Sequence, residues 1–303
     1  MAPIPPSHQT NRVVIYHQTI HDRDGNHVSL LPLLTEEIAV THIIVAAIHL
    51  NDPPGNIHLN DHPPSDPRFE QLWEEVDTLQ FTGIKVLGML GGAAKGSFKR
   101  LDGDILQFEQ YYQPLRAMVL ERHLDGLDLD VEEDMSLNGI IRLIERLHTD
   151  FGNDFLITMA PVATALMGGP HLSGFDYETL EVMMGSKIAF YNTQFYNGWG
   201  SLQNMTGYEV IIARGYPPEK VVIGMLTNPV NGGSGWVPFD LLERIVLSLK
   251  AQHLGFGGIM GWEYFNSLPG DKSRPWELWR RVATTLRADV FASAAATETP
   301  FIQ

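Results

Sequence analysis

The sequence predicts an α/β fold built as a single (β/α)₈ barrel, the TIM barrel. Short apolar or alternating segments, which are typical of strands, recur eight times along the chain, and each is followed by a segment with helical spacing. The length of 303 residues, 44% of them hydrophobic, suits one such barrel, and no Pro- or Ser-rich linker divides it. We therefore expect an N-terminal extension (1–11), a barrel domain (12–287) and a tail with little pattern (288–303).

The predicted strands are connected in the way that parallel strands require. Each is separated from the next by a helical segment, and strands bounded in this way are usually parallel and buried. The expected strands are 12–19, 41–50, 85–90, 123–132, 155–161, 187–196, 220–226 and 257–264.

The helical segments are predicted from their spacing and their start signals. Asp66 and Pro67, for example, form a good helix start, with a capping acid followed by proline in the first turn. Residues 51–65, rich in Pro, Asn, Asp and His, are expected to form a long loop, and so are the Gly- and Pro-rich residues 162–175. Helices are expected from Thr35, over 66–81, 107–122 and 137–150, from Asp176, and over 208–214, 239–252 and 273–287.

The fourth predicted strand has an unusual acidic face. Its period-two alternation places Asp128, Asp130 and Glu132 on one side and aliphatic residues on the other. Like charges this close cannot all ionise cheaply, so their pKa values should spread apart. General acid catalysis needs such a spread, and the strand is therefore a candidate catalytic element.

An edge strand or a calcium loop accounts for the acidic residues less well. A solvated edge strand can carry acids against aggregation, but the helical patterns on both sides favour a buried parallel strand. A calcium loop counted from Asp128 would need glycine at its sixth position, and Glu133 stands there.

Composition excludes several classes of partner and cofactor. The net charge of −15 and pI of about 5.1 disfavour binding to nucleic acid or an anionic membrane. The absence of cysteine excludes disulfides, thiolate metal sites and cysteine nucleophiles. No apolar run is long enough to cross a bilayer, and residues 1–7 lack the features of a signal peptide. We expect a cytoplasmic protein, or a secreted one if a signal peptide has been removed.

Neither the histidines nor the glycine-rich segment indicates a cofactor. His58 and His62 have a metal-ligand spacing, but the prolines around them argue against the helix which that spacing would need. The glycines of 88–92 fail as a phosphate loop because Lys95 precedes Gly96 rather than following it. No cofactor and no metal are therefore expected.

Residues 125–132 resemble a known family signature. They read Asp-Gly-Leu-Asp-Leu-Asp-Val-Glu and match the DxxDxDxE motif of glycoside hydrolase family 18, which contains chitinases and endo-β-N-acetylglucosaminidases. At the end of the third strand Met89 replaces the serine of the family's SxGG, so any hydrogen bond from that serine is absent. The resemblance covers 12–287, and four other strand ends match: 89–92, 159–161, 194–197 and 258–263.

The resemblance implies roles for the acids. Glu132, nearest the barrel mouth, would protonate the glycosidic oxygen while the substrate's own N-acetyl oxygen attacks the anomeric carbon, giving an oxazolinium ion. Asp130 would orient the acetamide and stabilise its charge, and Asp128 would share a proton with Asp130. Tyr196 would donate a hydrogen bond to the acetamide oxygen, although a purely structural core tyrosine is the alternative.

Other residues are candidates for sugar binding. Trp262 would form the floor of the −1 subsite by apolar stacking, with barrel packing as a close alternative. Trp199 and Trp236, in loops, are either sugar platforms or loop anchors. The remaining candidates are Gln194 and Asn197 beside Tyr196, Tyr16 and Gln18 on the floor, and Met159, Gly91 and Gly92 at the matching strand ends.

The segment after the seventh strand bears on substrate choice. Residues 227–238 are too short for the extra domain that encloses the cleft of many chitinases, so an open groove suited to a branched glycan is expected. Segments 15–19, 58–64 and 260–267 resemble fungal endo-β-N-acetylglucosaminidases, which cut between the two core N-acetylglucosamines of N-glycans, core-fucosylated in some cases. A monomer acting on N-glycans or glycoproteins is the leading hypothesis. The alternatives are a class III-type endochitinase and an inactive glycan-binding lectin, against which the intact Glu132 argues.

Overall fold

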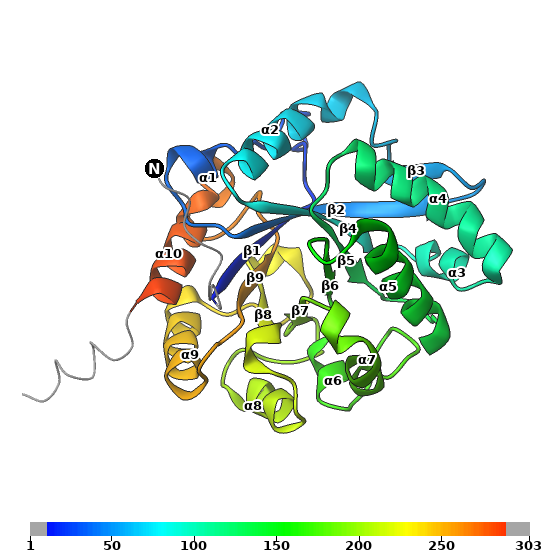
Figure 1. Ribbon diagram of the computed structural model, residues 1–303. Coiled ribbons are helices and arrows are strands. Elements are labelled where there is room, and N and C mark those ends of the chain that lie inside the picture. The colour runs from blue at the N-terminus through cyan, green and yellow to red at the C-terminus, as the bar shows by residue number, and fades with distance from the viewer. Residues whose placement is uncertain (1–10, 289–303) are drawn as a thin grey trace, which may run out of the picture.

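The computed structural model describes residues 11–288, and its centre is a closed barrel of eight parallel strands (Figure 1). Nearly all of the predicted N-terminal extension and tail lie outside the described residues. The barrel closes because β1 pairs with both β2 and β9, which confirms the predicted fold. The barrel strands are β1 (Arg12–His17), β2 (His42–Asn51), β4 (Lys85–Gly91), β5 (Gly126–Asp130), β6 (Leu156–Met159), β7 (Phe190–Gln194), β8 (Val221–Leu226) and β9 (Gly258–Trp262).

Helices surround the barrel as an outer ring (Figure 1). Several begin at acidic or hydroxyl caps: Asp104, Ser136 and Asp176 accept hydrogen bonds from backbone N–H groups of the first helical turn. The helices are α1 (Pro32–Thr35), α2 (Glu70–Phe81), α3 (Ser97–Leu101), α4 (Ile105–Glu121), α5 (Leu137–Phe151), α6 (Ala163–Leu166), α7 (Tyr177–Met184), α8 (Thr206–Ala213), α9 (Phe239–Gln252) and α10 (Trp276–Arg287). Within 11–288, none of them is long and apolar enough to cross a membrane.

Strand alternation divides the interior into two layers. Val13 and Ile15 belong to the large core between strands and helices, whereas Val14 and Tyr16 belong to a smaller cluster inside the barrel. On β5 the same alternation sends the leucines toward the helices and the aspartates toward the barrel axis.

Several predicted boundaries need correction. The helix expected from Thr35 instead ends there, because Pro32 fits the first helical turn. The expected loop 51–65 contains a strand, β3 (Asn56–Leu59), which pairs antiparallel with β2. The isoleucine and leucine of β3 alternate with polar residues and are buried, and this signal was hidden by the prolines around it.

Other differences are smaller. The predicted strand from residue 187 begins at Phe190, because Gly185–Lys187 form a 3₁₀ turn. The helix expected from 107 begins at Ile105, directly after its Asp104 cap. The acidic strand is shorter than predicted and ends at Asp130, so Glu132 lies just beyond it, at the barrel mouth.

Candidate active site

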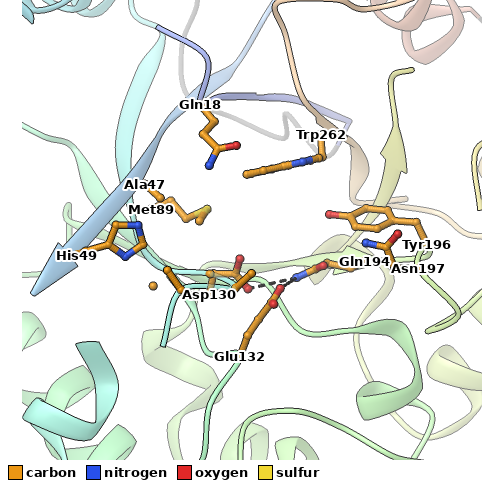
Figure 2. Close-up of a pocket in the computed structure, with 14 residues that line it drawn as sticks. Gln18, Ala47, His49, Met89, Asp130, Glu132, Gln194, Tyr196, Asn197 and Trp262 are labelled. Atoms are coloured by element: carbon orange, nitrogen blue, oxygen red, sulfur yellow. Dashed lines mark hydrogen bonds between the residues drawn. The ribbon is translucent and has the colours of Figure 1, made fainter. Parts of the chain in front are cut away.

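A pocket of about 330 Å³ opens at the C-terminal ends of the barrel strands (Figure 2). This is the end of the fold at which TIM-barrel enzymes carry their active sites. Its walls come from strands and loops widely separated in the sequence: Gln18, Ala47, His49, Met89, Gly91, Gly92, Ala93, Ala94, Asp130, Glu132, Gln194, Tyr196, Asn197 and Trp262.

Asp128 lies beneath this pocket and does not line it. The carboxylate is fully buried and accepts hydrogen bonds from Tyr16 Oη at 2.6 Å, Thr158 Oγ1 at 2.6 Å and Asn192 Nδ2 at 3.0 Å. Burial raises the pKa of Asp128, while the three hydrogen bonds act in the opposite direction. Three donors around one buried carboxyl hold the base of the site in a single geometry.

Gln194 connects the two acids that reach the pocket. Its Nε2 lies 3.2 Å from Asp130 Oδ1 and 3.3 Å from Glu132 Oε1 (Figure 2). The same Nε2 lies 2.8 Å from the carbonyl oxygen of Ala160. One N–H of the amide donates to Ala160 and fixes its orientation, so the second N–H, rather than the carbonyl oxygen, faces the two acids and is shared between them. Gln194 therefore holds the side chains of Asp130 and Glu132 together.

The environment makes both acids bind protons more tightly than usual. Burial, followed by the charges of Glu132 and Asp128, raises the pKa of Asp130 well above its ordinary value. Burial also raises the pKa of Glu132, opposed by the Gln194 hydrogen bond and the charge of Lys95. No hydrogen bond within 11–288 joins Asp128 to Asp130, so their predicted proton sharing stays a prediction. A protonated acid at the mouth of a pocket is suited to general acid catalysis.

Two aromatic side chains face the acids across the pocket. Trp262 projects from the end of β9, and its ring centroid lies 5.6 Å from that of Tyr16 below it. The Tyr196 hydroxyl points into the pocket (Figure 2). Burial and then the charges of Asp130 and Glu132 raise the pKa of Tyr196 far above its ordinary value, so the phenol stays protonated and can donate a hydrogen bond.

The glycine pair at the end of β4 brings this strand close to the acids. Both residues adopt positive φ values, +97° at Gly91 and +87° at Gly92. The Gly92 N–H donates a 2.9 Å hydrogen bond to the carbonyl of Asp130. A β-carbon at Gly91 would lie 2.4 Å from the Phe98 ring and 2.5 Å from that carbonyl, so only glycine permits this approach.

Some predicted residues lie away from the pocket. Met159 is fully buried in the core between strands and helices. Its neighbour Thr158 is the residue that faces the barrel interior, where it contacts Asp128. The substrate-binding prediction for Met159 therefore needs correction. Trp199 packs against the core and exchanges backbone hydrogen bonds with Tyr196 and Thr164, which fits the loop-anchor alternative. Trp236 is half-buried in the loop after β8 and does not line the pocket.

Several residues of the site were not predicted. Thr158 and Asn192 hold Asp128, and both occupy inward positions that strand alternation could have identified. His49 and Ala47 of β2 line the pocket, as do the alanines after the glycine pair, and their sequence context carries no chemical signal. Within 11–288, no three His, Asp or Glu side chains are grouped so as to hold a metal ion.

Comparisons with known proteins identify the family and agree with the fold. The family model described as "Glycosyl hydrolases family 18" matches residues 12–231. The structure of a fungal endo-β-N-acetylglucosaminidase from this family is similar with a TM-score of 0.88 at 50% identity, covering 91% of this chain and 98% of that one. A chitinase of Aspergillus fumigatus is similar with a TM-score of 0.85 at 54% identity, covering 91% of this chain and all (100%) of that one.

A curated relative is also a chitinase. "Chitinase 2" of Rhizopus oligosporus is 29% identical over 206 residues, which cover 62% of this chain. The matched part spans only 35% of that relative's length.

Proposed function

Because the chain belongs to glycosyl hydrolases family 18, we propose that it is an endo-β-N-acetylglucosaminidase that cleaves the β-1,4 bond between the two core N-acetylglucosamines of N-glycans. One observation carries the proposal: Gln194 holds Asp130 and Glu132 together, with raised pKa values, opposite Tyr196 and Trp262 in one pocket. The 50% identical fungal endo-β-N-acetylglucosaminidase supports the choice of substrate.

The arrangement fits substrate-assisted catalysis. Glu132, partly exposed at the pocket mouth, gives its proton to the glycosidic oxygen as the bond to the anomeric carbon breaks. The acetamide oxygen of the −1 sugar attacks that carbon and forms an oxazolinium ion. Asp130 accepts the acetamide N–H and offsets the developing charge, while the Tyr196 hydroxyl donates to the acetamide oxygen. Trp262 provides the apolar floor beneath the −1 ring.

This mechanism fixes the stereochemistry. The acetamide covers one face of the anomeric carbon, so water activated by Glu132 arrives on the face from which the leaving group departed. Nuclear magnetic resonance of the first product should show the β-anomer. An initial α-anomer would exclude the substrate-assisted scheme.

The choice between N-glycan and chitin depends on the groove. The segment between β8 and α9, residues 227–238, contains only a 3₁₀ turn (Pro229–Asn231) and adds no domain along the cleft. An open groove suits a branched glycan. The test is a side-by-side digest of a complex-type glycopeptide and chitohexaose at equal enzyme concentration, followed by mass spectrometry. We expect released glycan, with one N-acetylglucosamine left on the peptide and little chitohexaose cleavage.

The alternative is an endochitinase, favoured by the 54% identical Aspergillus chitinase and by the Rhizopus relative. Faster cleavage of chitohexaose would establish that alternative and leave the glycosidase chemistry intact. Binding of either substrate without release of product would indicate a lectin instead.

A further inference from the structure

The loop between β8 and α9 connects two sides of the catalytic pocket, and we call its residues 228–235 the bridging loop. Because β8 lies between β7 and β9 in the barrel, this loop passes between the end of β9, at Trp262, and the end of β7, which is followed by Tyr196 and Asn197. These three residues line the pocket (Figure 2), whereas residues 228–235 themselves do not. The bridging loop therefore supports the pocket walls from outside.

Asn231 makes the contact at the Trp262 end. Its amide pairs reciprocally with that of Asn266: Asn231 Nδ2 lies 2.9 Å from Asn266 Oδ1, and Asn266 Nδ2 lies 2.7 Å from Asn231 Oδ1. The second N–H of Asn231 is shared between the Trp262 carbonyl oxygen, 3.3 Å from Nδ2, and Thr227 Oγ1, 3.0 Å from it. The backbone N–H of Thr227 donates to the same Trp262 carbonyl at 2.9 Å. The backbone of Trp262 is thus held from the side of the bridging loop.

Asn197 makes the contact at the other end. Its backbone N–H donates to the carbonyl of Ser234 at 2.9 Å, and its Oδ1 accepts the N–H of Gly233 at 2.8 Å. Gly235 has a positive φ of +94°, and a β-carbon there would lie 2.7 Å from the Cα of Tyr196. The bridging loop therefore packs directly against the backbone that carries Tyr196.

The two contacts are close together in the chain. Only Gly232 separates Asn231 from Gly233. A β-carbon at Gly232 would lie 2.7 Å from Asn197 Oδ1, so the loop runs tightly against that side chain. The start of the loop is fixed as well, because the side chain of the buried Asn228 is hydrogen-bonded through both its oxygen and its nitrogen. A shift at one end of the bridging loop therefore reaches the other end.

We propose that Asn231 is a positioning residue, which fixes the separation between Trp262 and Tyr196 through the bridging loop. This inference rests on the proposed function, in which Trp262 packs beneath the −1 sugar while Tyr196 hydrogen-bonds its acetamide. The acetamide oxygen reaches the anomeric carbon only when both contacts are made on the same sugar. Asn231 does not line the pocket, so its effect on the reaction passes through the loop.

Asn231→Asp tests the Trp262 end. The carboxylate still accepts a hydrogen bond from Asn266 Nδ2, but it no longer donates to Trp262 or Thr227. On a complex-type glycopeptide we expect kcat to fall at least about tenfold while KM stays within about threefold, since a misplacement of about 1 Å costs on the order of 10² in rate. Asn153→Asp, at an exposed position between α5 and β6, is the matched control. Wild-type kcat in Asn231→Asp would overturn the proposal.

Gly233→Pro tests the Asn197 end, because it removes the N–H that Asn197 Oδ1 accepts. Gly233→Ala is its control: it keeps the N–H, and the added β-carbon would lie 3.9 Å from Asn197 Oδ1. We expect the proline variant alone to repeat the loss of kcat. Combined with Asn231→Asp, it should lower kcat by no more than about a further twofold, because either change already releases the bridge. Losses that multiply in the double variant would show that the two ends act separately, which overturns the proposal.

A third measurement separates positioning from a general loss of structure. A stable thiazoline analogue of the oxazolinium ion, carrying mannose on its −1 sugar, uses both contacts at once. Its inhibition constant should rise across the variants by the factor by which kcat/KM falls, while urea denaturation shows each variant to be folded. A lower kcat with unchanged thiazoline inhibition would overturn the proposal. Should Asn231→Asp not fold, the comparison of Gly233→Pro with Gly233→Ala decides.

The outcome for Asn231 is distinguishable from the outcome for the proposed function. Preferred cleavage of chitohexaose in the digest described above rejects the N-glycan assignment alone. The same variants are then measured on chitohexaose and on a chitobiose thiazoline, whose −1 sugar also carries an acetamide-derived ring. A parallel loss of turnover and thiazoline inhibition supports the positioning role there too, and the absence of that loss rejects it.

Discussion

Tyr16 Oη donates a 2.6 Å hydrogen bond to Asp128 Oδ2, which joins the first strand to the acidic strand across the barrel interior. Both side chains are buried, and neither lines the catalytic pocket. The Tyr16 ring also lies 5.6 Å from that of Trp262. One tyrosine therefore supports both the buried acid and the aromatic side chain of Trp262, although it does not itself line the pocket.

Replacing Tyr16 with Phe should lower both stability and turnover. The Asp128 carboxyl loses one of its three donors, and a hydrogen bond to a charged group contributes about 1.5–3 kcal/mol. Urea denaturation should show a fall in unfolding free energy of this size, and kcat should fall while KM changes little. Tyr264→Phe is the matched control, because the buried Tyr264 hydroxyl has no hydrogen-bond partner within the described residues. A change of equal size in both variants would contradict the role assigned to Tyr16.

Glu132→Gln should nearly abolish hydrolysis while the fold and glycan binding remain. The amide keeps the shape of the side chain and loses the proton, and general acid catalysis contributes about 10²–10⁴ in rate. The measurements are initial rates on a glycopeptide and calorimetric binding of the same substrate. Turnover near that of the wild type would remove Glu132 from the mechanism.

Asp130→Asn should separate the two halves of the reaction. Hydrolysis falls because the oxazolinium forms without its stabilising carboxylate, whereas a preformed sugar oxazoline is still used, with Glu132 acting as base. The assay follows transfer from the oxazoline to an N-acetylglucosamine acceptor. Loss of both activities would instead indicate a wider role of Asp130, such as holding the strand together.

Lys95→Met should shift the pH profile toward alkali. The positive charge of Lys95 lowers the pKa of Glu132, so its removal lets that pKa rise. A general acid works only while protonated, so the alkaline limb of kcat/KM should move to higher pH. Lys99→Met, a nearby exposed lysine on α3, is the control and should leave the profile in place. An unchanged or acid-shifted limb in Lys95→Met would refute the coupling.

His17 should make the fold sensitive to acid. Burial lowers the pKa of His17 to about 3, whereas in the unfolded chain it returns to 6.5. Between these values the unfolded state binds more protons, so stability is full above about pH 6.5 and declines as the pH falls toward 3. His17→Leu should reduce this decline, measured as the unfolding free energy from urea denaturation at pH 7 and pH 4. The control His171→Leu, at an exposed position, should leave the decline unchanged. An equal decline in wild type and His17→Leu would show that other groups dominate.

Local periodicity determined the barrel and the acidic face. A strand reverses the direction of its side chains at each residue, so Asp128 and Asp130 had to share a side once the segment was a strand. The recurrence of strand and helix patterns likewise determined the eight-stranded fold. These features depend on near neighbours in the chain, and a sequence displays near neighbours directly.

The contacts across the barrel were decided only by tertiary structure. Asp128 meets Tyr16, Thr158 and Asn192 because closure and register bring their strands together, although the chain separates Asp128 from Tyr16 by 112 residues. The same closure places Gln194 between the two pocket acids. Met159, by contrast, faces the helices, because barrel orientation rather than residue type decides which of two neighbouring residues points inward. Register and closure are set by packing summed over the whole barrel, and no single segment of the sequence encodes them.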